Sequence, residues 1–346
     1  MGRVTRALSG EGVQRSTVSR ITKRLDEQVE GLRRAPIEDP VPYLYLDATF
    51  LDVRWARQVE NVSALVAYGI DAEGKRRLLA ITIGVQESEE SWAELLRQLV
   101  DRGLTGIRLV ISDAHAGLAG AVRRLLPEAE HQRCTVHLTR NVVAKVPQRL
   151  RKRVAKEVVR ILHAPSLAQA KKRKAVFESG LGTPALHKPD ALNRSGGLRQ
   201  GRAGLQLGRF RISLAVGSRH IACPPCRAGT HAGFRRTSAP GYATRGGTQV
   251  PEAAQCLAGG FPAATRYFAY PKEHWIRIRS TNGLERLHEE IKRRTRAVGA
   301  FPDRASALRL VTAVALQVTA VWSDRCYLDV SLLIQDNHDT QEAQSA

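Results

Sequence analysis

Residues 43–54 read YLYLDATFLDVR, an apolar sequence with one aspartate, Asp47, near its centre. The alternating Tyr, Leu, Phe and Val residues predict a strand that packs in a sheet. Aspartate is a poor strand former and is rarely buried without a partner. One interpretation places Asp47 at an edge or strand end that reaches water. The other assigns its carboxylate to a metal or catalytic site.

The residues that follow predict a sheet built around this strand. After residues 43–53 we expect strands at 62–70, 76–85, 106–113 and 131–138, and helices at 87–104 and 114–127. Three strands, a helix, a strand, a helix and a strand is the order of a ribonuclease-H-like α/β core. We expect the first three strands to be antiparallel and the later ones to add parallel to the first, giving a mixed sheet flanked by helices.

The composition indicates a partner class. Lys and Arg number 54 against 33 Asp and Glu, a formal charge of +21 over 346 residues. Such an excess suits a polyanion, because basic side chains neutralise phosphates and release counterions. Ribosomal, membrane-surface and DNA-acting proteins share this bias. Five scattered cysteines do not predict a disulfide scaffold. No apolar run approaches the roughly 20 residues of a membrane span, and we expect a soluble intracellular protein.

Residues 1–36 predict a helical DNA-binding remnant. Ser16 or Thr17 is the expected N-cap of a helix with Val18, Ile21 and Leu25 at helical spacing. The pattern resembles the second half of a helix-turn-helix, with Ser16, Thr17 and Arg20 at the exposed start of the recognition helix. An ordinary amphipathic helix explains it equally well. The first helix of such a unit needs residues before Met1, so we expect a truncated N-terminus.

The rest of the chain divides by composition. We expect the first part of the catalytic core at 40–140, an insertion at 141–265, C-terminal core helices at 266–330 and a disordered tail at 334–346. Within the insertion, residues 186–249 lose periodicity and become rich in Arg and Gly. They are interpreted as a flexible basic linker, as a zinc site at Cys223 and Cys226, or as the product of a shifted reading frame. Zinc is not expected, because only one such cysteine pair exists.

A second acid, Asp113, is predicted to lie close to Asp47. Asp113 ends the fourth predicted strand, which neighbours the first, so both carboxylates meet at one sheet edge. A third acid from a later helix would complete a pocket for two Mg²⁺ ions, which Mn²⁺ can replace. Glu285 is the best candidate, with Glu289 and Glu290 as rivals. The alternative for any of them is a surface ion pair, such as Glu289 with Arg293.

Polar and basic residues around these acids are the expected DNA contacts. Arg286, Lys292, Arg293 and Arg294 flank Glu285 and can hold phosphates beside the metals. The complete predicted set of DNA-binding residues is Ser16, Thr17, Arg20, Arg279, Asn282, Arg286, Lys292, Arg293 and Arg294.

Four segments carry a resemblance to a known family. They are residues 43–54, 109–118 (LVISDAHAGL), 132–141 (QRCTVHLTRN) and 274–303 (HWIRIRSTNGLERLHEEIKRRTRAVGAFPD). They resemble the Mutator-type bacterial insertion-sequence transposases, part of the DDE superfamily with a ribonuclease-H-like catalytic domain. The likeness covers about residues 12–180 and 250–330.

The resemblance implies roles for particular residues. Asp47, Asp113 and Glu285 become the metal-binding catalytic triad, and Cys134 and His137 match a C-x-x-H element close to the active site. Without the family, Cys134 is a small core residue and His137 a helix-start residue.

The resemblance also implies a function. A transposase of this kind cleaves element ends and joins the 3′-hydroxyls to target DNA, acting on terminal inverted repeats as a homo-oligomer, in the cytoplasm at the nucleoid and away from membranes. Family members carry a helical insertion that residues 186–249 do not match. We therefore favour a compensated frameshift, which could leave a protein that folds its first half but does not position Glu285, so that inactivity of this chain is one expectation. The alternatives are a non-catalytic DNA-binding remnant and a metal-dependent nuclease on the same core.

Overall fold

The computed structural model describes residues 14–180, except 57 and 85, and residues 251–333, except 323. These residues belong to one compact unit of the chain. Predictions about residues 186–249, including zinc at Cys223 and Cys226, and about the tail at 334–346 lie outside the described residues. The domain boundaries stay predictions.

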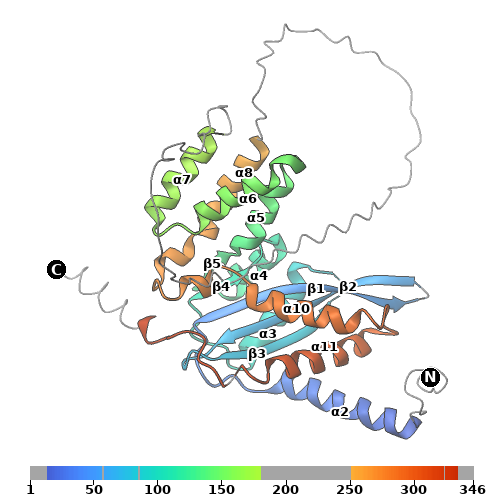
Figure 1. The fold of residues 1–346 in the computed structure, drawn as a ribbon. Coiled ribbons are helices and arrows are strands. Elements are labelled where there is room, and N and C mark those ends of the chain that lie inside the picture. Colours follow the sequence, from blue (N-terminus) through green and yellow to red (C-terminus); the bar gives the residue numbers. More distant parts are fainter. Residues whose placement is uncertain (1–13, 57, 85, 181–250, 323, 334–346) are drawn as a thin grey trace, which may run out of the picture. The chain divides into compact units, whose positions relative to one another are not determined.

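The described residues form one five-stranded sheet and the helices around it (Figure 1). The strands are β1 Tyr43–Trp55, β2 Gln58–Ile70, β3 Arg76–Gly84, β4 Leu109–Ser112 and β5 Glu130–Arg133. The helices before the undescribed segment are α2 Arg15–Arg34, α3 Glu89–Asp101, α4 Ala116–Leu125, α5 Thr135–Ala144, α6 Gln148–Leu162 and α7 Leu167–Gly180. Those after it are α8 Pro251–Ala264, the 3₁₀ helix η1 Arg266–Ala269, α9 Trp275–Ile278, α10 Asn282–Thr295 and α11 Arg304–Thr319.

The sheet has the order β3-β2-β1-β4-β5. β1 pairs antiparallel with β2, and β2 with β3, whereas β4 is parallel to β1 and β5 is parallel to β4. This confirms the predicted antiparallel meander with later strands added parallel to the first. The fold is a ribonuclease-H-like mixed sheet.

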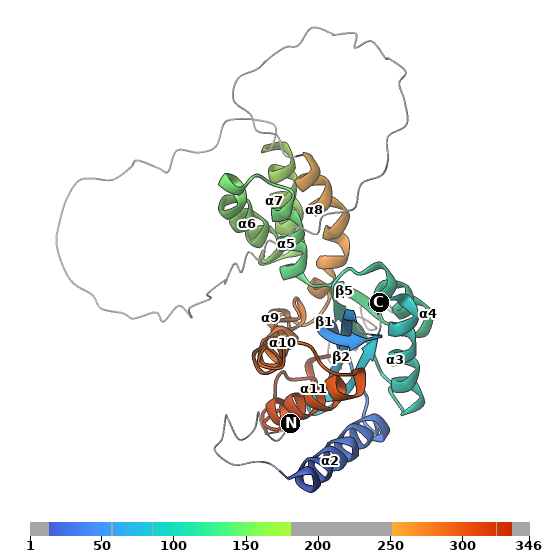
Figure 2. The ribbon, with the colours of Figure 1, turned by 90° about the vertical axis from the view of Figure 1, so that its right-hand side faces the viewer.

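Successive side chains of β1 point to opposite faces of the sheet and pack in two separate apolar cores. Tyr45 packs in one core with Leu287 of α10, and the adjacent Leu46 packs in the other with Trp92 of α3. Figure 2 shows α3 and α4 on one face of the strands and α10 and α11 on the other. Because both faces are covered, β1 is apolar at almost every position in its first half. Asp47 is therefore the exception in a strand buried on both sides.

Side-chain caps begin two of the helices, and the one cap predicted from the sequence can be compared with the start of α2. Ser88 Oγ accepts the Ser91 N–H at 3.2 Å and begins α3, and Asp303 Oδ1 accepts the Ser306 N–H at 2.7 Å and begins α11. The cap predicted at Ser16 or Thr17 is wrong, because α2 begins at Arg15 with Gln14 at the N-cap. Both predicted residues lie inside the first turn of the helix.

The predicted fifth strand at 131–138 is too long. β5 ends at Arg133, and α5 begins at Thr135. The change occurs at Cys134, whose N–H donates to Ser112 O at 2.7 Å and whose carbonyl accepts the Leu138 N–H at 3.0 Å. One residue thus closes the strand pairing with β4 and opens the helix.

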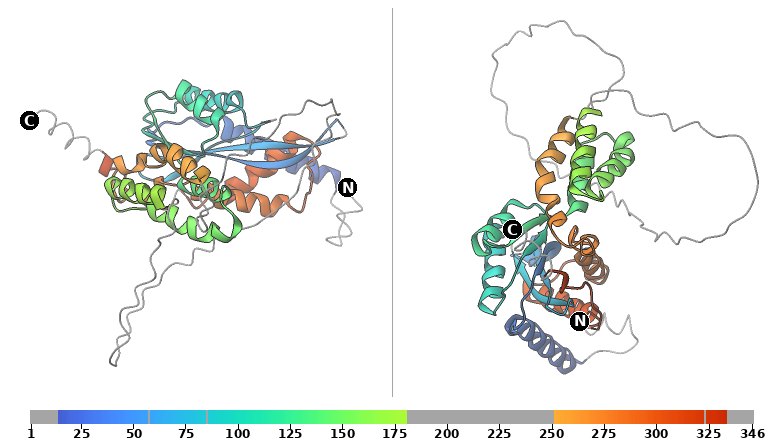
Figure 3. Two further views of the ribbon diagram at one scale, coloured as in Figure 1. Left: turned by 90° about the horizontal axis from the view of Figure 1, so that it is seen from above. Right: turned by 90° about the vertical axis from the view of Figure 1, so that its left-hand side faces the viewer.

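Helices α5 to α8 share a third apolar core, although α8 follows the undescribed segment in the sequence (Figure 3). Gly260 of α8 allows close approach to α5, since a Cβ there would lie 2.5 Å from Leu138 Cδ1. The buried amide of Gln132 on β5 forms hydrogen bonds to the end of α8 and to η1. It donates to Ala264 O at 2.9 Å and accepts the Tyr267 N–H at 2.8 Å. Among the described helices, none is long and apolar enough to cross a membrane.

Candidate active site

Strand pairing places the two aspartates side by side. The last paired residues of β1 and β4 are Tyr45 and Ile111. Asp47 and Asp113 each lie two residues further along, so they occupy corresponding positions where the parallel pair ends. Each carboxylate accepts the backbone N–H of the next residue, Asp47 Oδ1 from Ala48 at 3.0 Å and Asp113 Oδ1 from Ala114 at 2.6 Å. These bonds orient both side chains.

Glu285 reaches the site from the first turn of α10. Leu284, Leu287 and Ile291 form the buried stripe of this amphipathic helix and fix its rotation against the sheet. Glu285 lies beside that stripe, with 24% of its side chain exposed, and its Oε1 lies 2.8 Å from Nη1 of Arg140 on α5. The third predicted acid therefore faces α5 rather than open solvent.

His137 connects two of the three acids. Its Nδ1 lies 4.0 Å from Asp113 Oδ1 and its Nε2 lies 3.8 Å from Glu285 Oε1. The imidazole thus lies between carboxylates supplied by the end of β4 and the start of α10. The structure brings Asp113, His137 and Glu285 together from three elements that are far apart in the sequence.

Cys134 is a buried residue that contacts the start of α10 next to the site. The thiol is fully buried, and Sγ accepts the Thr281 N–H at 3.4 Å and the Thr281 hydroxyl at 3.5 Å. Thr281 is the N-cap residue of α10, and the N–H of Cys134 is already bonded to Ser112 O. Cys134 therefore links the end of β4, the start of α5 and the start of α10.

The electrostatics of the site are strongly coupled. Burial, with smaller contributions from the negative charges of Glu285 and Asp113, raises the pKa of Asp47 to about 7 against the opposing effects of His137 and the Ala48 N–H. Burial lowers the pKa of His137, but its contact with Cys134 and the charges of Asp47 and Asp113 outweigh that effect and raise it to about 9. At neutral pH His137 is a cation that offsets part of the negative charge.

Two further residues were missed by the sequence analysis. His288 Nδ1 lies 3.6 Å from Asp47 Oδ2. Because burial and the charges of Lys292 and His137 lower the pKa of His288 to about 3, the ring is neutral. The other missed residue is Arg140, the partner of Glu285. The available signal was helical spacing: His288 follows Glu285 by three residues, and Arg140 follows His137 by three.

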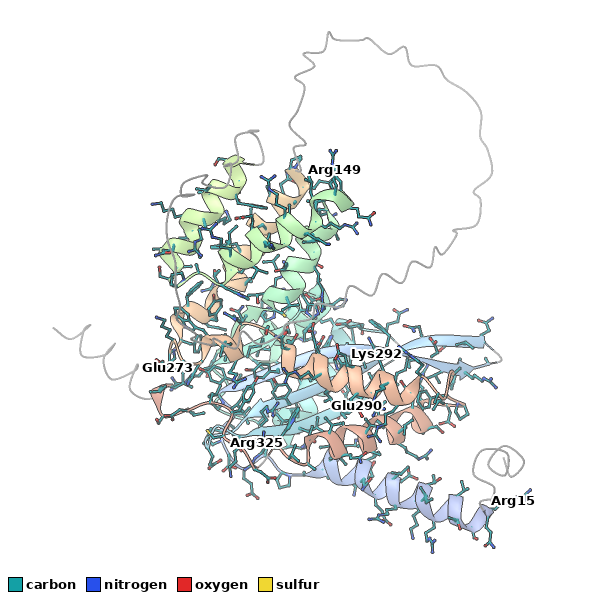
Figure 4. The ribbon with its side chains drawn as sticks, in the orientation of Figure 1. Arg15, Arg149, Glu273, Glu290, Lys292 and Arg325 are labelled. Atoms are coloured by element: carbon teal, nitrogen blue, oxygen red, sulfur yellow. The ribbon has the colours of Figure 1, made fainter. Side chains whose placement is uncertain are left out.

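The basic end of α10 differs in detail from the expectation. Arg293 Nε lies 2.9 Å from Glu290 Oε2, and Arg294 Nε lies 3.0 Å from Glu290 Oε1. The partner of Arg293 is therefore Glu290 and not Glu289, because the i to i+3 geometry brings the guanidinium to Glu290 first. Figure 4 labels Glu290 and Lys292 on α10. Lys292 and Arg286 are exposed.

The other predicted DNA contacts have varied surroundings. Ser16 and Arg20 are exposed on α2, and Thr17 is half-buried. Arg279 is also half-buried, and its carbonyl accepts the Thr135 N–H at 3.0 Å. Asn282 is the first residue of α10. DNA contact by these residues stays a prediction.

Whether the three acids could bind a metal ion depends on their spacing and on their chemistry. Within residues 14–180 and 251–333, no group of three or more His, Cys, Asp and Glu side chains is close enough to hold one. The donor set nevertheless fits a hard divalent cation, because all three acids offer carboxylate oxygens and a cation would offset both the burial and the like charges that raise the pKa of Asp47.

The sheet order and the acids from β1, the end of β4 and α10 define a ribonuclease-H-like α/β protein with an acidic site. The model of the family described as "Transposase, Mutator family" matches residues 1–188 and 237–325. The chain belongs to this family, which confirms the resemblance.

Individual relatives agree with the family match. The transposase for insertion sequence element ISRM5 of Rhizobium meliloti is 29% identical over 93% of this chain and 64% of its own length. The IS406 transposase of Burkholderia multivorans is 31% identical over 90% of this chain and 64% of its own length. The IS1081 transposase of Mycobacterium tuberculosis is 32% identical over 96% of this chain and 65% of its own length. This chain thus spans just under two thirds of these relatives.

Among solved structures, the Drosophila P element transposase strand transfer complex aligns with 99% of this chain and 82% of its own, at 10% identity and a TM-score of 0.30. This likeness is too weak to carry an argument.

Proposed function

We infer that the protein is a DNA transposase that cleaves the ends of its element and joins the 3′-hydroxyls to target DNA. The observation that carries the proposal is that Asp113 and Glu285 lie 4.0 and 3.8 Å from the ring nitrogens of His137, whose pKa the charge of Asp47 also raises. Carboxylates held close together repel one another, which costs free energy. Arrangements of this kind are concentrated at functional sites. Family membership supports the reaction class.

Divalent metal ions fit the site as cofactors. Asp47, Asp113 and Glu285 are the residues that would hold Mg²⁺, or Mn²⁺ in its place, since these ions prefer oxygen ligands. When bound, such ions activate the attacking oxygen and neutralise the leaving one in phosphodiester displacement.

The neighbouring side chains have their own tasks in this proposal. His137, a cation at neutral pH, holds the Asp113 and Glu285 carboxylates on either side of its ring. The Arg140 side chain is 59% exposed beside Glu285, so it can contact a DNA phosphate at the site. His288 is neutral and keeps its ring against Asp47, which restricts the rotamers of that carboxylate.

The partners follow from the reaction. We infer that the DNA substrates are the terminal inverted repeats of the element and a target duplex. Joining two ends at one target requires at least two active sites, so we expect a homo-oligomer on DNA. A substrate of this kind places the protein on the nucleoid in the cytoplasm.

A strand-transfer assay tests the proposal. The full chain is incubated with a labelled duplex carrying the inverted repeat that flanks its gene and with plasmid target, in Mg²⁺ or Mn²⁺, and products are separated on a denaturing gel. We expect cleavage at the repeat end and joined products, both absent in Asp47→Asn and Asp113→Asn.

The alternatives give different gels. Cleavage that is indifferent to the repeat sequence indicates a metal-dependent nuclease on the same core. Repeat binding by the folded chain without cleavage in either metal indicates a non-catalytic remnant. Activity that survives Asp47→Asn refutes the assigned triad.

A further inference from the structure

A stripe of basic side chains runs along the outer face of α6. Its members, Arg149, Lys152, Arg153, Lys156 and Arg160, are all exposed; we call them the α6 basic stripe. At 3.6 residues per turn, these five positions fall within a sector of about 100°. Val154, Val158, Ile161 and Leu162 are buried on the opposite side of the helix.

Four of the five side chains of the stripe have no partner among the residues that the structure describes. In the part of the chain that the structure describes, the side chains of Lys152, Arg153, Lys156 and Arg160 make no hydrogen bond, ion pair or ring contact. Glu157 is the only acid of α6. Figure 4 labels Arg149 at the start of this helix, far from Lys292 on α10.

Several arginines on other elements have acidic partners. Pairs within 3.5 Å join Arg77 to Asp71, Arg97 to Glu94, Arg124 to Glu89, Arg293 to Glu290, Arg304 to Glu60 and Arg309 to Asp26. A solvated face of ordinary composition would mix both signs in the same way. On α6, by contrast, four exposed cations lie on one helical face without an acidic partner among the described residues.

The surroundings of α6 argue against a membrane. A helix that binds a lipid surface needs its apolar face free for the acyl boundary. The apolar face of α6 is instead buried against α5 and α8, in the core that includes Val142, Val158 and Leu257. Only the charged face is available to a partner.

We propose that the α6 basic stripe binds the phosphate backbone of duplex DNA, as a surface separate from the catalytic residues. From Arg149 to Arg160 the helix rises about 16 Å, the axial length of about five base pairs at 3.4 Å each. Cations in a rigid row of this length match a row of phosphates. Because such contacts do not read bases, the stripe would position the duplex without choosing its sequence.

The test is a salt titration of DNA binding. Fluorescence anisotropy measures the affinity of the full chain for a 30-base-pair duplex of arbitrary sequence in EDTA, from about 50 to 300 mM KCl. Each lost phosphate contact lowers the slope of log K against log [salt] by about 0.9. For Arg153→Gln/Lys156→Gln/Arg160→Gln we expect the slope to fall by about 2 to 3 and the affinity near 100 mM salt to fall on the order of a hundredfold.

Two variants make the result interpretable. Arg97→Gln/Arg124→Gln/Arg266→Gln removes the same charge from acid-paired positions and should lower affinity less than about threefold. Arg153→Lys/Lys156→Arg/Arg160→Lys keeps the stripe charge and should keep the slope. Equal losses in the two Gln variants overturn the proposal, because net charge alone would then explain binding. A wild-type chain that does not bind the duplex also overturns the proposal. The candidate partner of the stripe would then be an acidic protein. Because EDTA removes the cofactor, failure of catalysis does not affect this measurement.

Discussion

The sheet region and helix α6 use arginine differently. Around the sheet, Arg97 lies 2.7 Å from Glu94 and Arg304 lies 3.4 Å from Glu60, so surface cations are balanced locally. On α6, Arg153 and Arg160 have no acidic partner among the described residues. At the edge of the sheet, burial and neighbouring carboxylates raise the pKa of Asp47 to about 7.

This difference separates two tasks. Excess negative charge on a rigid sheet edge suits cation-dependent chemistry at a fixed point. Excess positive charge along an exposed helix suits contact with an extended polyanion. If the separation holds, substitutions near the sheet edge change catalysis with little effect on DNA affinity, and substitutions on α6 do the reverse.

The largest effect is expected at Glu285. Glu285→Gln removes one carboxylate charge from the site, and a loss of about 4 kcal/mol of transition-state stabilisation corresponds to about a thousandfold in rate. Glu289→Gln is the matched control, since Glu289 is exposed one turn along the same helix. Cleavage rates under single-turnover conditions measure both, and a comparable loss in Glu289→Gln would show that the wrong acid was assigned.

A second prediction asks whether the two regions unfold together. Trp92 is fully buried in a sheet core and Ile161 is buried in the α5–α8 core. Trp92→Ala should lower the free energy of unfolding by about 3–5 kcal/mol and Ile161→Ala by about 2–5 kcal/mol. Chemical denaturation followed by circular dichroism and by tryptophan fluorescence checks this. If the unfolding curves from the two probes coincide, the two regions unfold as one cooperative unit. If Ile161→Ala shows a transition by only one probe, the two regions unfold separately.

A smaller effect is expected at Cys134, which supports the site without being exposed. Cys134→Ala leaves the buried Thr281 N–H without its acceptor, at a cost of about 1–3 kcal/mol. Cys134→Ser keeps an acceptor and should lose less. Urea unfolding of the two variants measures the difference; equal losses would mean that packing, and not the bond to Thr281, explains the role of Cys134.

The smallest effect is expected at Glu290 and depends on pH. Hydrogen bonds from Arg293 and Arg294 lower the pKa of Glu290 from 4.5 to about 2. The pair therefore contributes stability above about pH 4.5, and this contribution is lost as pH falls toward 2. Because the pair is exposed, Glu290→Gln should lower the Tm by less than about 2 °C at pH 7. Thermal melts at pH 7 and pH 3 should show the difference shrinking at the lower pH.

Much of the sheet was predictable because its signals are local. The apolar alternation of residues 43–46, the acidic start of α3 and the order of elements indicate the ribonuclease-H-like fold directly. The errors occurred where a contact distant in sequence decides: Cys134 ends β5 because its N–H pairs with Ser112. The cap at Gln14 was missed because polar side chains at Ser16 and Thr17 fit the same pattern.

The candidate site was predictable only in part. Asp47 and Asp113 were predicted from strand order, and Glu285 was preferred among the acids of its helix before the resemblance to the family supported that choice. Arg140 and His288 were missed, since one arginine in a basic chain and one histidine beside a glutamate carry no signal by themselves. Their contacts depend on how α5 and α10 are rotated against the sheet.

The sequence by itself indicated most of the elements, the family and the candidate acids, because propensity, periodicity and motifs act over neighbouring residues. Only the tertiary structure decided which charges meet. It placed His137 between Asp113 and Glu285, and it buried one side of α6 so that the stripe faces water. Electrostatic interactions depend on distance and burial rather than on sequence separation. The same arginine is therefore a paired surface charge on α3 and an unbalanced one on α6.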